Sequence, residues 1–153
     1  MRWAELTLGR SFGVSLDTGE DLIPSLLDFC RSQGVSQGYV PMFIAGMSEA
    51  ELVGTCEKVV DPFAPVWSSV HLENIEAAGC GTLATDPTTG ELTVHIHVSV
   101  GLKGQSAVAH TSHLLSAKVL FLTELLIMEV ASPTMLRLRD ASQHDAPLLH
   151  YHP

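Results

Sequence analysis

The segment from Glu91 to Val100 has the strictest pattern in the chain, because apolar and polar residues alternate along its whole length. One parity is aliphatic (Leu92, Val94, Ile96, Val98, Val100), and the other is polar (Thr93, His95, His97, Ser99). Successive side chains of a β-strand point to opposite faces, so a period of two is typical of a half-buried strand. We therefore predict a strand that packs one face on a core and presents both histidines together on the other.

The rest of the chain is expected to add one helix and several further strands to the same domain. Acidic residues in the first turn after Asp17-Thr18-Gly19, an early Pro24 and a stop at Gly34 are typical of a helix. Further strands are predicted at 39–45, 79–83, 119–130 and 135–139, and residues 48–53 suit either a short helix or a strand. Together these elements predict a single α/β domain over residues 1–140, followed by a polar, mobile tail over residues 141–153.

The charge balance of the 153-residue chain argues against two classes of partner. Seventeen acidic residues against eight basic ones give a formal net charge of -9, and only Arg137 and Arg139 lie close together among the basic residues. Binding to nucleic acid draws most of its affinity from Lys and Arg that neutralise phosphates. Direct binding to nucleic acid or to an anionic membrane surface is therefore not expected. The charged fraction is only 16%, which indicates either a large core or a surface covered by other subunits.

The cysteines and the apolar segments predict a cytoplasmic protein. Cys30, Cys56 and Cys80 are odd in number and have no CxxC spacing, so neither a disulfide framework nor a thiolate zinc site is indicated. No secretory h-region is evident near the N-terminus. The most apolar stretch, 119–130, contains two glutamates and is too short to span a bilayer. Reduced thiols in the cytoplasm are the expected state.

Histidines are the strongest indication of a functional site. Side chains at i and i+2 of a strand lie about 6.5–7 Å apart and point the same way, so His95 and His97 can converge on one metal ion. A third ligand must come from elsewhere, and the loop that follows offers His110 and His113. The alternative is a polar strand face that merely contains two histidines. The tail also carries His144, His150 and His152, for which adventitious metal binding is the expectation.

A catalytic metal site also needs a carboxylate as a base or as an orienting group. Glu124 is the first candidate because it lies within the apolar run 119–130, and Glu73 and Glu76 come next. Charged side chains are seldom fully buried unless they are paired. Glu124 is therefore expected to orient a histidine ring, to act as the catalytic base, or to lie at the rim of the core.

Four segments resemble characteristic stretches of the plants-and-prokaryotes-conserved (PPC) domain family. They are LDTGEDLIPSLLDFCRSQGV, GYVPMFIAGMSEAELVG, GCGTLATDPTTGELTVHIHVSV and SHLLSAKVLFLTELLIMEV. The resemblance runs from about Leu6 to Arg139. The histidine that precedes leucine in the family corresponds to His113, whereas His110 falls before it. The chain departs from the family in having Thr111 and Ser112 where two glycines are usual.

This resemblance implies a stand-alone, prokaryotic-type member with an α+β fold, in which a largely antiparallel sheet is flanked by helices. It also implies a homotrimer that binds a metal ion, with zinc expected first, at His95, His97 and His113. The implied function is metal binding with a regulatory or unknown biochemical role and a small molecule as a further ligand. The alternative is a zinc-dependent enzyme that acts on a small molecule. DNA binding is a third reading, which the charge and the lack of an AT-hook disfavour.

Overall fold

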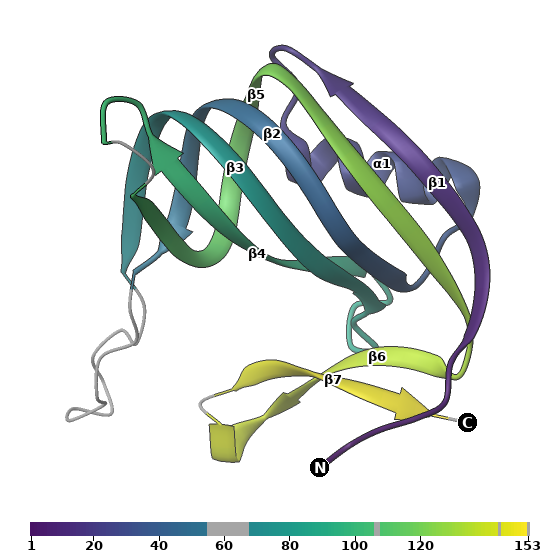
Figure 1. Cartoon of the computed structure of the whole chain (residues 1–153). Helices are drawn as coiled ribbons and strands as arrows, with labels where there is room; N and C mark the ends of the chain where they lie inside the picture. The colour runs from purple at the N-terminus through teal and green to yellow at the C-terminus, as the bar shows by residue number, and fades with distance from the viewer. Residues whose placement is uncertain (55–67, 106–107, 144, 153) are drawn as a thin grey trace.

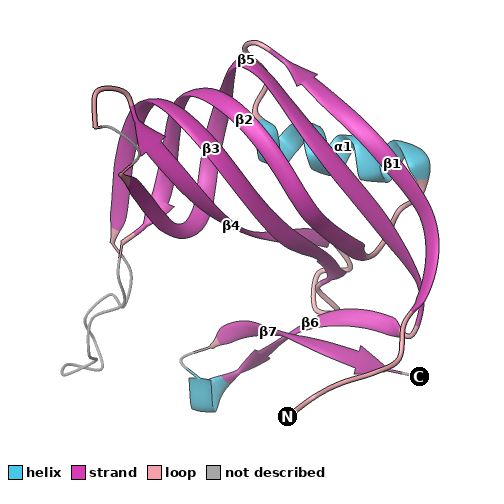
Figure 2. Cartoon of the chain, viewed as in Figure 1, coloured by secondary structure: helices cyan, strands magenta, loops and turns pink. Residues whose placement is uncertain are grey.

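The computed structural model describes residues 1–54, 68–105, 108–143 and 145–152. The elements, in chain order, are β1 (Thr7–Asp17), α1 (Leu22–Gln33), β2 (Gly38–Val53), β3 (Ser69–Thr85), β4 (Leu92–Leu102), β5 (Ala109–Ser132), β6 (Thr134–Asp140), the short 3-10 helix η1 (Ala141–Gln143) and β7 (Ala146–His152). Figure 1 shows their arrangement, and Figure 2 separates helix from strand.

Four of the strands close into an antiparallel barrel. β2 pairs with β3 and β5, and β4 pairs with the same two strands, so the four form a continuous ring. β5, with 24 residues the longest strand, pairs with β4 near its start, with β2 over its middle and with β1 toward its end. β1 therefore lies outside the ring, alongside β5 (Figure 1).

The expected fold class, an α/β sheet flanked by helices, is wrong. The described residues form seven strands and a single α-helix, and the sheet closes on itself. Residues 48–53, which suited helix or strand, continue β2, and the apolar run 119–130 is one part of the long strand β5. Strands form in these segments because each pairs on both edges, residues 48–53 with β3 and β5 and residues 119–130 with β2 and β1. These pairings satisfy the backbone N–H and C=O groups without helices.

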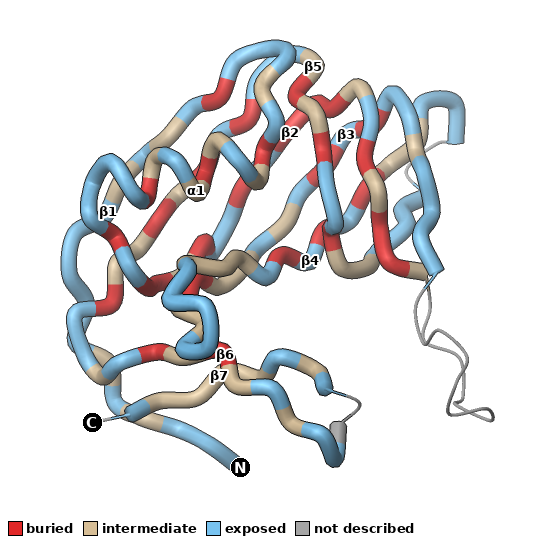
Figure 3. Tube along the Cα trace, turned by 180° about the vertical axis from the view of Figure 1, so that it is seen from behind, coloured by how far each residue is buried: buried red, intermediate tan, exposed pale blue. Residues whose placement is uncertain are grey.

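The helix α1 follows the expectation at both ends. It starts at Leu22 and ends before Gly34, whose φ of 67° is left-handed and whose N–H donates to the carbonyl of Arg31. Leu22, Leu26 and Cys30 are fully buried. They join the core cluster that apolar side chains from the barrel strands also form, so α1 covers the core with one apolar stripe. Figure 3 shows the buried positions along each strand.

A C-terminal hairpin replaces the mobile tail that the sequence predicted. Residues 146–152 form β7, which pairs in antiparallel register with β6 over its whole length. The hairpin touches the barrel through a parallel bridge between Thr85 and Leu136. A second, smaller core cluster joins Met135, Ala84 and Val130, with Tyr39 and Tyr151 packed against it. These contacts fix the hairpin beside β3.

The buried side chain of Gln37 fastens the connection between β5 and β6. Its Nε2 donates to the carbonyl oxygens of Val130 and Pro133, both at 2.9 Å, and its Oε1 accepts the backbone N–H of Met135 at 2.7 Å. Because all these groups are part-buried or buried, their hydrogen bonds hold the start of β6 in one position relative to β2.

The remaining expectations from the sequence concern the membrane and the cysteines. None of the helices in the described ranges is long and apolar enough to cross a membrane. Cys30 is a buried free thiol, and Cys80 is an exposed one. Cys56 and His144 lie outside the described residues.

Candidate metal centre

β4 has the two faces that its alternating sequence predicted. Ile96, Val98 and Val100 are each 1% exposed or less and pack in the core. His95 and His97 project from the opposite face, and their ring centroids lie 5.1 Å apart. The strand thus fixes two imidazoles next to each other without exposing its apolar side.

His113 joins this pair from the neighbouring strand. β5 begins at Ala109, so His113 lies on a strand, and it sits directly opposite His97 in the β4–β5 register. Its ring centroid is 4.8 Å from that of His95 and 5.7 Å from that of His97. His110 lies opposite Val100 and is not part of the group. The structure therefore brings together the three histidines that the resemblance had selected.

The three side chains fit a metal ion in geometry and in protonation. Each offers one ring nitrogen, and these atoms all lie within 4.8 Å of one another. Nitrogens bound to a tetrahedral zinc ion at about 2.0–2.1 Å are about 3.3 Å apart, so small ring rotations would complete such a site.

Burial, assisted by Arg137 and the neighbouring histidines, lowers the pKa of His95 to about 4. Burial also lowers the pKa of His113. Both rings are therefore neutral at pH 7, the form that binds metal.

Two glycines of β3 allow β4 to approach closely at this point. A Cβ on Gly79 would lie 2.6 Å from the backbone oxygen of His97, and a Cβ on Gly81 would lie 2.6 Å from that of His95. Real Cβ atoms do not reach such distances without a shift of the neighbouring backbone. The segment Gly79-Cys80-Gly81 thus lets the strand that carries the histidines pair tightly with β3.

A buried arginine lies beside the histidines, and the sequence analysis did not select it. Arg137 of β6 is 5% exposed. Its Nη2 donates to the carbonyl oxygen of Thr82 at 3.4 Å and to Thr82 Oγ1. Thr82 is the β3 partner of His95 in the β3–β4 register. The charge of Arg137 contributes to the lowered pKa of both His95 and His113.

The sequence does not single out Arg137. β6 alternates, and Arg137 shares its parity with Met135, which is fully buried, but also with the exposed Arg139. Charged side chains are rarely buried without a partner, so a basic residue of this parity is expected at the surface. Two tyrosines complete the polar surroundings: the hydroxyls of Tyr39 and Tyr151 lie 2.9 Å apart. Burial raises the pKa of Tyr39 to about 12, so its phenol is neutral.

Comparison with known proteins identifies the family. Residues 4–131 match the Plants and Prokaryotes Conserved (PCC) domain. The chain belongs to this domain family. The resemblance drawn from its sequence segments is thereby confirmed. No curated protein matches the chain.

Several solved structures share the fold of this PCC domain. A plant- and prokaryote-conserved (PPC) protein from Pyrococcus horikoshii is 20% identical with a TM-score of 0.81, over 100% of this chain and 99% of that one. A metal-containing protein from Archaeoglobus fulgidus is 22% identical with a TM-score of 0.78, over 100% of both chains. Acetolactate decarboxylase from Bacillus subtilis subspecies spizizenii is 15% identical with a TM-score of 0.55, over 92% of this chain and 61% of that one. At these identities the likeness concerns the fold.

The structure does not bring the candidate carboxylates of the PCC domain to the histidines. Glu124 is exposed and lies opposite Ser15 of β1 and Ile44 of β2, in a part of β5 that does not pair with β4. Glu73 contacts His71 at 3.4 Å. Glu76 lines a hollow described below. Among the described residues, the metal-ligating group therefore consists of imidazoles alone.

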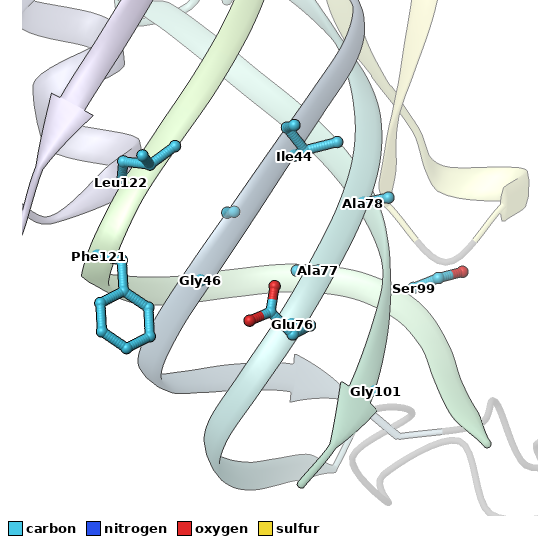
Figure 4. Close-up of a pocket in the computed structure, with 10 residues that line it drawn as sticks. Ile44, Gly46, Glu76, Ala77, Ala78, Ser99, Gly101, Phe121 and Leu122 are labelled. Atoms are coloured by element: carbon cyan, nitrogen blue, oxygen red, sulfur yellow. The ribbon is translucent and has the colours of Figure 1, made fainter. Parts of the chain in front are cut away.

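A hollow in the described surface is lined by none of the three histidines. It has a volume of about 560 Å³ and is lined by residues of β2, β3, β4 and β5. Figure 4 shows Ile44, Phe121 and Leu122 around it, with the carboxylate of Glu76 at one side. Its lining is mainly apolar and contains no histidine, so it offers no metal ligands beyond that single carboxylate.

Two tail histidines, His150 and His152, lie on β7. Their rings are stacked with centroids 6.4 Å apart, and they do not belong to the three-histidine group.

Proposed function

We propose that this PCC-domain protein is a homotrimeric metal-binding protein that holds one zinc ion per chain through His95, His97 and His113. The observation that carries the proposal is the convergence of three ring nitrogens within 4.8 Å, with no carboxylate among the described ligands. Three imidazoles with one open position suit zinc, although nickel, cobalt and iron also accept imidazole. The metal-containing relative from Archaeoglobus fulgidus supports a metal in this fold.

A bound zinc ion would act as a Lewis acid and lower the pKa of a water on its open position. The chain's own contribution is to hold the three rings mutually oriented on two paired strands and to keep those of His95 and His113 neutral. The described residues place no carboxylate within the histidine group to act as a base. This favours a binding protein with a regulatory or still unknown role, located in the cytoplasm with reduced thiols.

A zinc-dependent enzyme acting on a small molecule is the second candidate. The observation that favours it is the fold shared with acetolactate decarboxylase, an enzyme with a small-molecule substrate. Direct DNA binding is not proposed, because the net charge is -9 and the basic residues are scattered.

Metal analysis of protein purified without a histidine tag tests the proposal. We expect about one zinc ion per chain by inductively coupled plasma mass spectrometry, either as purified or after zinc loading and removal of excess metal. A chain that stays metal-free after loading would contradict the proposal, and the histidines would then be the polar lining of an organic ligand site. Substoichiometric metal that a chelating resin removes at once would point to the tail histidines instead.

Exposed apolar side chains on β2 and β5 support the proposed trimer. Phe121 is 68% exposed, and Ile44 and Leu122 are 46% and 45% exposed around the hollow of Figure 4. An apolar patch of this kind on a soluble chain is typical of an interface. Light scattering is expected to give three times the chain mass of 16.5 kDa. Phe121→Asp should lower this mass, whereas Leu8→Asp on β1 should not; a wild-type monomer at all concentrations would contradict the trimer.

A further inference from the structure

The side chain of Arg137 is the feature of this site that metal binding leaves unexplained. It is 5% exposed, yet no carboxylate among the described residues pairs with it. Its recorded hydrogen bonds all come from Nη2 and go to Thr82. A buried charge that lacks an opposite charge is costly, so such a group calls for an anionic partner.

The unused donors of Arg137 are accessible to a ligand. Nε and Nη1 donate to none of the described residues. In the described part of the chain, the one fully buried side-chain polar atom without a partner is Thr123 Oγ1. Nε and Nη1 therefore retain some contact with solvent. A guanidinium presents its N–H groups as a planar fork that matches the two oxygens of a carboxylate.

The guanidinium of Arg137 lies next to the proposed metal site. Thr82, which Arg137 contacts, is paired with His95 across β3 and β4. The surrounding polar groups are the hydroxyls of Tyr39 and Tyr151, and no carboxylate among the described residues pairs with the guanidinium. A ligand in this place would meet two cationic centres on different strands, a metal ion on β4 and β5 and the guanidinium on β6.

We propose that Arg137 forms a carboxylate subsite beside the metal, and that the ligand is a small 2-oxo or 2-hydroxy acid. The carboxylate pairs with the Arg137 fork, while the adjacent oxygen of the ligand takes the open position on the metal. This inference rests on the proposed metal site and defines the class of molecule that reaches it. It calls for a second oxygen group beside the carboxylate, so that each centre has an oxygen ligand of its own.

Isothermal titration with pyruvate as the probe tests this subsite on the zinc-loaded protein. Wild type is expected to bind pyruvate, and Arg137→Gln to bind it at least about tenfold more weakly, about 1.4 kcal/mol, with the zinc content unchanged. Arg139→Gln is the matched control, since Arg139 is exposed on the same hairpin and donates only to the backbone oxygen of Asp145. It should bind pyruvate as wild type does.

A comparison of two ligands on the wild-type protein tests the subsite even if Arg137→Gln fails to fold. Methyl pyruvate keeps the 2-oxo group but lacks the anionic carboxylate, so it should bind much more weakly than pyruvate. Three results would overturn the carboxylate subsite while leaving the metal proposal intact. They are equal binding of pyruvate and methyl pyruvate, equal binding of pyruvate by wild type and Arg137→Gln, and tighter binding of inorganic phosphate than of pyruvate. If the protein holds no zinc, the metal proposal fails, and loss of pyruvate binding in Arg137→Gln would still support the subsite in the metal-free protein.

Discussion

The double variant His95→Ala/His97→Ala is expected to lose stoichiometric zinc. Each single change removes one of the three proposed ligands. Removal of a group that only orients a ligand lowers metal affinity by roughly 10–100-fold, so loss of a ligand itself should lower the zinc affinity by more. The same loss is expected for His113→Ala, because this residue lies directly opposite His97. Competition of each variant with a zinc indicator of known affinity would measure the change.

His110→Ala is the matched control for the histidine variants. His110 lies on the same strand as His113 but outside the group, so its removal should leave the zinc affinity close to that of wild type. The fold should survive every one of these changes, because Ile96, Val98 and Val100 carry the core packing of β4. One zinc ion per chain in the double variant would move the site elsewhere, to the tail histidines first.

Gly79→Ala is expected to damage both the fold and the site. The new Cβ would lie 2.5 Å from two ring atoms of Phe43 and 2.6 Å from the backbone oxygen of His97. Overpacking of this kind typically costs about 1–3 kcal/mol, and a clash with backbone places the cost at the upper end of that range. We expect a lower urea midpoint and weaker zinc binding, because relief of the clash must move either β4 or Phe43.

Gly13→Ala on β1 gives the control for this prediction. A Cβ at Gly13 meets nothing within 4 Å, so this change should be neutral or stabilise the fold by up to about 1 kcal/mol through the unfolded state. Urea denaturation of the two variants side by side makes the comparison. Equal stability of Gly79→Ala and Gly13→Ala would show that β3 and β4 are not held as closely as described.

The half of the site that lies on one strand was predictable from local pattern alone. The alternation around Ile96 fixes which side of β4 is buried, so the common direction of His95 and His97 follows from the period of two. His113 was different. Its position opposite His97 depends on the β4–β5 register, which spacing does not reveal, and the residues alone left His110 as an equal choice. The family resemblance selected His113, and the structure groups it with the pair.

The fold class and the surroundings of the site were beyond local reasoning for physical reasons. A barrel closes through pairings between distant segments, and the apolar run 119–130, although predicted as a strand, does not reveal which strands it pairs with. Glu124 was expected near the core because its neighbours are apolar, yet Phe121 and Leu122 are themselves exposed. Arg137 reaches the site only because a hairpin that the sequence assigned partly to a mobile tail folds beside β3.

The long strand β5 also sets the order in which this chain can fold. Because β5 supplies an edge to β1, β2 and β4, the pairs that these strands form with β5 cannot assemble until residues 109–132 have left the ribosome. Until then only the antiparallel pairs β2–β3 and β3–β4 can form, and two-stranded or three-stranded pieces of this kind are marginal in water. Proteins dominated by such distant pairings fold slowly. The nascent chain therefore exposes its strand edges for most of its synthesis, and the histidine group assembles in the same late step that closes the barrel.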